Sequence, residues 1–81
     1  MDDESIRDRI SALVDREHQL RRQREDGSLD GRTEHDELHS TEVELDQCWD
    51  LLRQRRAKRD YGQDPDEATP RSGAVVEGYW Q

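Results

Sequence analysis

Apolar residues in the first third of the chain recur at the spacing of an amphipathic helix. They are four, three and seven residues apart, so all of them fall on one helical face. These residues are Ile6, Ile10, Leu13 and Leu20. The repeat has one polar position, which we call its polar step: Glu17 stands where a further apolar residue would be expected. Val14 lies beside the apolar face. The pattern predicts a helix over residues 3–26. The acids at positions 2–4 favour its start, because they cap free N–H groups and oppose the helix dipole.

A second stripe with the same spacing runs through residues 32–60. Its members are Leu38, Leu45, Cys48, Trp49 and Leu52. Thr41 stands at its one skipped step. Gly62 and Pro65 follow the stripe, so the second helix is predicted to end near residue 60.

A glycine-containing break separates the two stripes. Gly27 lies where a helix commonly has glycine just past its end. Thr33 and Asp36 resemble a capping box with Asp in place of Glu. The second helix is therefore predicted to start within residues 30–33.

The two stripes match when the chain folds back on itself as an antiparallel hairpin. Facing residues then have numbers that add up to 58, and the polar step at Glu17 falls opposite the polar step at Thr41. The other facing pairs are Leu20 with Leu38, Leu13 with Leu45, Ile10 with Cys48, and Ile6 with Leu52. This agreement predicts an all-α fold in which residues 1–60 form an antiparallel two-helix hairpin.

A hairpin with so few apolar layers needs additional support. Small chains bury a low fraction of their surface, and Val14, Trp49 and Leu51 widen the apolar faces beside the seam. We therefore expect a homodimer that forms a four-helix bundle of coiled-coil type. A larger host protein, or the C-terminal tail folded back as a cover, would meet the same need.

Residues 61–81 form a C-terminal tail that is rich in Gly, Pro, Asp and Ser up to residue 73. This composition is typical of a linker that is flexible or ordered only by contact. An apolar strip at residues 74–80 follows, and its bulky members are Val75, Val76, Tyr79 and Trp80. The strip either docks on the hairpin or binds a partner.

Composition limits the chain to one small domain. Of the 81 residues, 42% are charged and 28% are hydrophobic, and the mean hydropathy is −1.40. No apolar run exceeds three residues, so we expect neither a transmembrane helix nor a signal peptide. Cys48 is the single cysteine and cannot form an internal disulfide, which is typical of a cytoplasmic protein.

The net charge of −8 is unevenly distributed. Residues 27–52 carry eight acids and one base, whereas residues 53–59 carry five bases and no acid. A globally acidic chain binds nucleic acid poorly, because phosphate contacts need local positive charge. An RNA-binding role would therefore depend on residues 53–59.

Most of the candidate partner-binding residues belong to this basic run. They are Arg53, Arg55, Arg56, Lys58, Arg59, Tyr79 and Trp80. The hairpin register places Asp3 opposite Arg55 and Asp2 opposite Arg56. The basic residues therefore either close this end of the hairpin with ion pairs or bind an anionic partner. Such a partner could be RNA, a phosphate-bearing ligand or an acidic protein patch.

Three histidines and the cysteine are the other candidates for chemistry. His35 and His39 share one helix face, and the register brings His18 near His39, as a zinc site would require. Asp36 stands where a zincin motif has Glu, and no third-ligand motif follows. We therefore expect solvated histidines with no metal or cofactor, and a Cys48 that packs in the core.

Three segments of the chain resemble a small family of uncharacterised bacterial proteins. The segments are LDQCWDLLRQRRA at 45–57, DPDEA at 64–68 and VEGY at 76–79. The family is mostly actinobacterial and is known only as a domain of unknown function. The turn sequence SLDGRTEHD departs from the Ser-Pro-Glu-rich helix start of the family. The resemblance implies a cytoplasmic actinobacterial protein whose tail belongs to the domain, and it implies no activity, cofactor or catalytic residue.

These observations favour a non-enzymatic interaction protein that acts through its helix faces and its tail. An enzyme is not expected, because nothing in the sequence pairs a nucleophile or a base with a pocket. The alternative is an RNA- or ribosome-associated factor that uses the basic end of the second helix. A metal-binding module with the three histidines is the third hypothesis.

Overall fold

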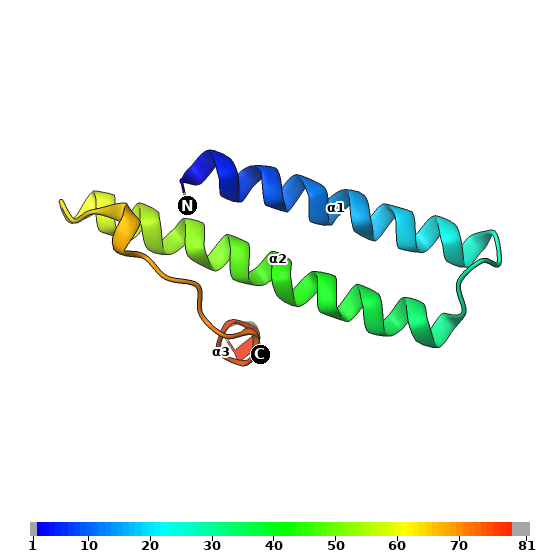
Figure 1. Cartoon of the computed structure of the whole chain (residues 1–81). Coiled ribbons are helices and arrows are strands. Elements are labelled where there is room, and N and C mark those ends of the chain that lie inside the picture. The colour runs from blue at the N-terminus through cyan, green and yellow to red at the C-terminus, as the bar shows by residue number, and fades with distance from the viewer. Residues whose placement is uncertain (1, 79–81) are drawn as a thin grey trace.

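Two long antiparallel helices form the body of the protein in the computed structural model, which describes residues 2–78 (Figure 1). Helix α1 spans Asp3–Glu25 and helix α2 spans Gly31–Asp60. A short 3-10 helix, η1 (Pro65–Glu67), and a six-residue helix, α3 (Gly73–Gly78), follow them. The molecule is elongated and measures 51 × 26 × 14 Å. The described part of the chain contains no strand, so the predicted all-α fold with two long helices is confirmed.

Aspartate side chains cap the start of both long helices. Asp2 accepts a hydrogen bond from the N–H of Ser5 at 2.8 Å, and Asp30 accepts one from the N–H of Thr33 at 2.7 Å. These bonds satisfy first-turn N–H groups that lack a helical partner, and they lower the pKa of both carboxyl groups. The predicted capping box at Thr33 and Asp36 is therefore wrong. Thr33 already lies inside the first turn, because Asp30 caps the helix three residues earlier.

Glycines end both long helices in the left-handed backbone region. Gly27 follows α1 with φ +83°, and Gly62 follows α2 with φ +70°. Residues with a Cβ rarely adopt this conformation, so glycine lets the chain leave the helix axis at these two points.

The core lies in the seam between α1 and α2 and continues under the tail. The buried hydrophobic residues are Ile6, Ile10, Leu13, Leu20, Leu45, Leu51 and Val76. Cys48 and Leu52 are partly buried and pack against this core, and Leu38 is also partly buried. The polar step in the seam holds Thr41, which is buried and donates its hydroxyl to the carbonyl oxygen of Glu37 at 2.8 Å.

Three residues beside the seam differ in their exposure. Val14 is 37% exposed and Trp49 is 49% exposed, so both lie beside the seam and outside the buried core. Leu51 is instead buried, at 6% exposed. The reason is that α2 packs against α1 on one side and against the tail on another.

The tail returns along α2. Within the described residues, η1 and α3 pack against α2, and neither packs against α1 (Figure 1). Gln47 donates to the carbonyl oxygen of Arg71 at 3.1 Å, and Gln54 donates to that of Thr69 at 2.9 Å. The buried Asp50 pairs with Arg71 at 3.4 Å. Polar side chains of α2 therefore hold the tail through two of its carbonyl oxygens and through the Arg71 side chain.

Apolar contact completes the docking of α3. Val76 is fully buried. Gly73 approaches α2 so closely that a Cβ built on it would lie 2.5 Å from Cγ1 of Val43. A side chain at this position would require the Val43 side chain or the backbone of α3 to shift.

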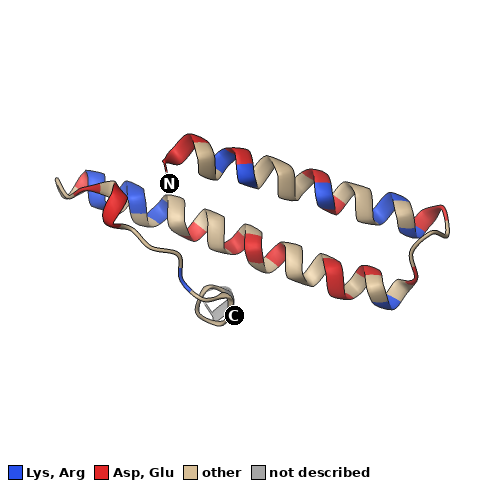
Figure 2. Cartoon of the chain, in the orientation of Figure 1, with Lys and Arg blue, Asp and Glu red and all other residues tan. Residues whose placement is uncertain are grey.

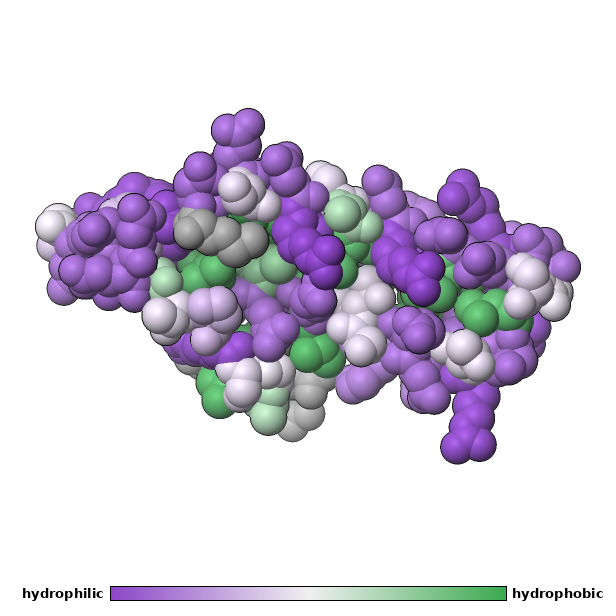
Figure 3. Space-filling view, in the orientation of Figure 1, coloured by the Kyte–Doolittle hydropathy of each residue, from purple (hydrophilic) through white to green (hydrophobic). Residues whose placement is uncertain are grey.

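The surface is predominantly polar. Figure 3 shows hydrophobic residues only in small separate patches on the viewed face. Figure 2 shows acidic residues along the middle of α2 and basic residues toward its C-terminal end. Among the helices described, none combines the length and the apolar character that a membrane span requires.

Candidate functional site

Part of the basic end of α2 is engaged inside the protein. Arg55 is only 6% exposed. Its Nε donates to Asp3 Oδ1 at 2.6 Å, as the hairpin register predicts, and its Nη1 donates to Asp66 Oδ1 at 2.9 Å. These hydrogen bonds lower the pKa of Asp3 and raise the pKa of Arg55. Lys58 lies 3.9 Å from Glu67 on the surface, where such a pair contributes little. Arg55 is therefore not available to a partner.

Asp3 also binds a second arginine. Arg59 Nη2 lies 2.9 Å from Asp3 Oδ2. The expected pair of Asp2 with Arg56 is not among the ion pairs of the described residues, because the Asp2 carboxylate caps α1 instead.

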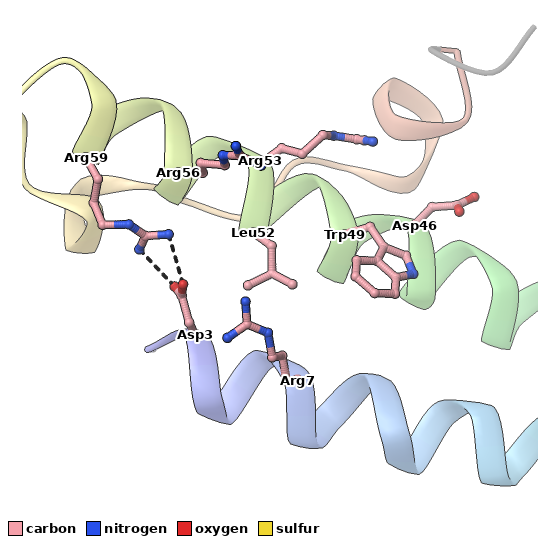
Figure 4. A pocket seen from close by; sticks show the side chains of 8 residues that line it. All are labelled: Asp3, Arg7, Asp46, Trp49, Leu52, Arg53, Arg56 and Arg59. Atoms are coloured by element: carbon pink, nitrogen blue, oxygen red, sulfur yellow. Dashed lines mark hydrogen bonds and ion pairs between the residues drawn. The ribbon is translucent and has the colours of Figure 1, made fainter.

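The other basic side chains line a groove between the start of α1 and the C-terminal half of α2 (Figure 4). We call it the Trp49 groove. Its lining residues are Asp3, Arg7, Asp46, Trp49, Leu52, Arg53, Arg56 and Arg59. Its volume of about 580 Å³ is within the usual range of ligand pockets. The half-exposed indole of Trp49 and the partly buried Leu52 give it an apolar surface.

The groove carries an excess of positive charge in an acidic chain. Four arginines and two aspartates line it, and the Asp3 carboxylate is already bound by two arginines. Arg7 and Arg56 are both exposed. Figure 4 shows the Arg7 side chain reaching from α1 toward Leu52. The groove therefore combines aromatic and aliphatic surface with guanidinium groups from two helices.

The sequence reasoning did not identify Arg7 as a site residue. It lies outside the basic run, on the other helix, and its own helix has near-balanced charge. The available signal was the hairpin register, which places Arg7 level with residue 51 of α2. A search of both helices at the same level would have found it.

Comparison of the sequence with known proteins identifies the family of this chain. Residues 2–81 match the family described as "Protein of unknown function (DUF2630)". The chain belongs to this family. Its relatives include uncharacterised proteins of Mycobacterium tuberculosis and Mycobacterium bovis. Each is 51% identical to the chain over 70 residues, which cover 86% of this chain and 80% of the relative. No solved structure matches the chain. The resemblance to an uncharacterised actinobacterial family is thereby confirmed.

The three histidines of this DUF2630 member are all exposed, at positions His18, His35 and His39. Within residues 2–78, no three His, Cys, Asp or Glu side chains are arranged to hold a metal ion. The predicted proximity of His18 to His39 stays a prediction.

The remaining candidates of this DUF2630 member are Cys48 and the end of the tail. Cys48 is partly buried, and burial together with the nearby Glu44 raises the pKa of its thiol. A raised pKa keeps the group a thiol at neutral pH and lowers its reactivity. Tyr79 and Trp80 lie outside the described residues.

Proposed function

We propose that this protein is a non-enzymatic interaction protein and that the Trp49 groove is where it binds a protein partner. The observation that carries the proposal is the half-exposed indole of Trp49, which lines the groove together with arginines from both helices. Trp and Arg are the residues most enriched among those that dominate binding energy at protein interfaces. Trp is also enriched at interfaces because its ring is apolar and its N–H is polar.

The chemistry of the groove supports binding rather than catalysis. Its titratable side chains are arginines and two aspartates. Arginine stays protonated, and hydrogen bonds from Arg55 and Arg59 hold the pKa of Asp3 below its usual range. Asp3 is therefore a poor general base at neutral pH, and among the described residues no Ser, Thr, Cys, His or Lys side chain lines the groove.

A capture experiment with matched variants tests this function. Trp49→Ala removes the central aromatic, and Tyr61→Ala removes an aromatic that is 83% exposed and outside the groove. A partner captured from an actinobacterial lysate should bind Trp49→Ala about thirtyfold more weakly, because a dominant Trp contributes about 2 kcal/mol or more. Binding to Tyr61→Ala should be unchanged. Equal binding to both variants, with their helical content intact, would contradict the proposal.

Deletion of residues 61–81 is a less specific test than these point variants. It would expose Leu51 and would remove Asp66, which binds Arg55. A loss of binding after this deletion would therefore report damage to the hairpin as well as loss of a contact.

An RNA- or ribosome-associated role is the second candidate, and the position of Trp49 beside arginines favours it. Exposed aromatic rings and guanidinium groups bind single-stranded RNA by stacking and by phosphate contacts. Arg53→Gln with Arg56→Gln leaves Arg55 and its internal contacts in place. RNA binding that does not change in this variant would eliminate the second candidate.

The predicted homodimer with a four-helix bundle is one form that a protein partner could take. It would cover the same exposed Trp49 and Val14. A cytoplasmic location belongs to the same proposal, and the single cysteine supports it because the chain cannot form an internal disulfide.

A further inference from the structure

Helix α2 presents three faces, and one of them is open. Leu45, Leu52 and Arg55 face α1, whereas Gln47 and Gln54 face the tail. The third face is a single stripe that we call the α2 stripe. Its residues are Glu42, Asp46, Trp49, Arg53 and Arg56. Consecutive members are four, three, four and three residues apart, so at 100° per residue they lie within about 80° of the helix circumference.

The α2 stripe is exposed along most of its length. Asp46 is partly buried, and the other four residues are exposed. Four of its five members line the Trp49 groove, and Glu42 extends the stripe toward the turn. A partner seated in the groove therefore contacts the stripe.

The charges of the stripe are opposite on the two sides of Trp49. Glu42 lies seven residues before Trp49 and Arg56 lies seven residues after it, which is roughly 10 Å in each direction. Asp46 lies roughly 4.5 Å before Trp49 and Arg53 roughly 6 Å after it at 1.5 Å per residue. A second α2 can pack antiparallel to the first, with the two Trp49 side chains against each other. Each acidic residue of the stripe then faces a basic residue of the other copy.

We propose that the occupant of the groove is a second copy of this chain, packed antiparallel along the α2 stripe with a twofold axis at Trp49. Asp46 of one copy then lies opposite Arg53 of the other, and Glu42 lies opposite Arg56. The twofold axis repeats both pairs, which is the self-complementarity that an isologous dimer requires. This inference rests on the proposed function, because it names the partner of the same groove.

The alternatives fit the stripe less well. A parallel pair of α2 helices would place acid on acid and base on base. A nucleic acid strand seated over Arg53 and Arg56 would pass Asp46 and Glu42 within roughly 20 Å, and these carboxylates repel phosphates. An antiparallel copy avoids both conflicts.

The α1 helices join the same interface. Arg7 places α1 at the edge of the groove, so the twofold axis sets the α1 helices of the two copies beside each other. The two hairpins together then form a four-helix arrangement. Asp46 and Arg53 also interact within their own chain. Their contacts across the interface therefore determine orientation more than affinity, and Trp49 supplies the desolvated centre.

Charge reversal on one side of Trp49 at a time gives the test. Glu42→Arg with Asp46→Arg makes the whole stripe basic, and Arg53→Glu with Arg56→Glu makes it acidic. In sedimentation velocity at micromolar concentration, the wild-type chain should be a dimer and each double variant a monomer. An equimolar mixture of the two double variants should form a heterodimer, and a chain with all four reversals should dimerise again.

Each result bears on the inference in a defined way. Circular dichroism should show unchanged helical content, because the reversed side chains lie on the open face of α2. A monomeric wild-type chain, a dimer that survives either double reversal, or a mixture that stays monomeric would overturn the inference. A monomeric chain whose captured partner is lost in Trp49→Ala would overturn this inference and leave the proposed function in place.

Discussion

Replacement of Val76 by Ala measures how strongly the tail is held on α2. Val76 is fully buried, whereas the preceding Val75 is 50% exposed, so the two residues are a matched pair on one short helix. Loss of two buried methyl groups costs about 1.6 kcal/mol at about 0.8 kcal/mol for each. The cavity that remains raises the cost to about 2 kcal/mol. A helix of six residues is not stable by itself. The substitution therefore reduces the free energy with which α3 is held on α2.

Hydrogen exchange detects this change directly. The N–H groups of Val75 and Val76 both donate to the carbonyl oxygen of Ser72 at 3.1 Å, and they exchange only when α3 opens. In Val76→Ala their exchange should be about thirtyfold faster, because about 1.4 kcal/mol corresponds to a factor of ten. Val75→Ala should change it about twofold or less, and amides in the seam, such as that of Ile10, should not change. Equal exchange in the two variants would show that Val76 does not hold the tail.

Three further predictions concern the caps and the ionisable groups. Because Asp3 has a lowered pKa, it stabilises the fold above its ordinary pKa of 3.8, and this stability is lost as the pH falls through its lower folded value. Asp3→Asn should therefore be less stable to urea at pH 7 and should lose less stability on acidification to about pH 2. Asp30→Ala should lower the melting temperature by several degrees and Thr33→Ala by less, since Asp30 is the cap; equal shifts would contradict this. The folded Cys48 thiol should react with a thiol reagent more slowly than the same thiol in urea, because its pKa is raised.

The sequence predicts α1 better than α2, and the number of neighbours explains the difference. Helix α1 packs against one other helix, so its single apolar stripe contains all four of its buried hydrophobic residues. Helix α2 packs against α1 and the tail, so a single stripe describes only part of its buried surface. This is why Leu51, which was predicted to lie beside the seam, is buried, whereas Trp49 on the apolar stripe is half-exposed.

The ion pairs at the open end of the hairpin also show how far the sequence pattern can predict side-chain contacts. The register correctly places Asp3 against Arg55, because both lie on the faces that the two helices share. It fails for Asp2 and Arg56, because Asp2 uses its carboxylate for a local hydrogen bond to the N–H of Ser5. The register predicts which residues lie at the same level along the hairpin. It does not predict whether a side chain binds a nearby backbone group or the residue that faces it on the other helix. The Trp49 groove was missed for a related reason, since it needs side chains from both helices.

The guanidinium of Arg55 links the two ends of the chain thermodynamically. It binds Asp3 in the first turn of α1, and it binds Asp66 and the carbonyl oxygen of Pro65 in η1. Opening the first turn of α1 removes one ligand of this guanidinium, and release of the tail removes the others. By reciprocity, release of the tail and opening of the first turn change each other's equilibrium by the same coupling free energy. A molecule that captures the tail would therefore loosen the N-terminal turn, although it never touches α1.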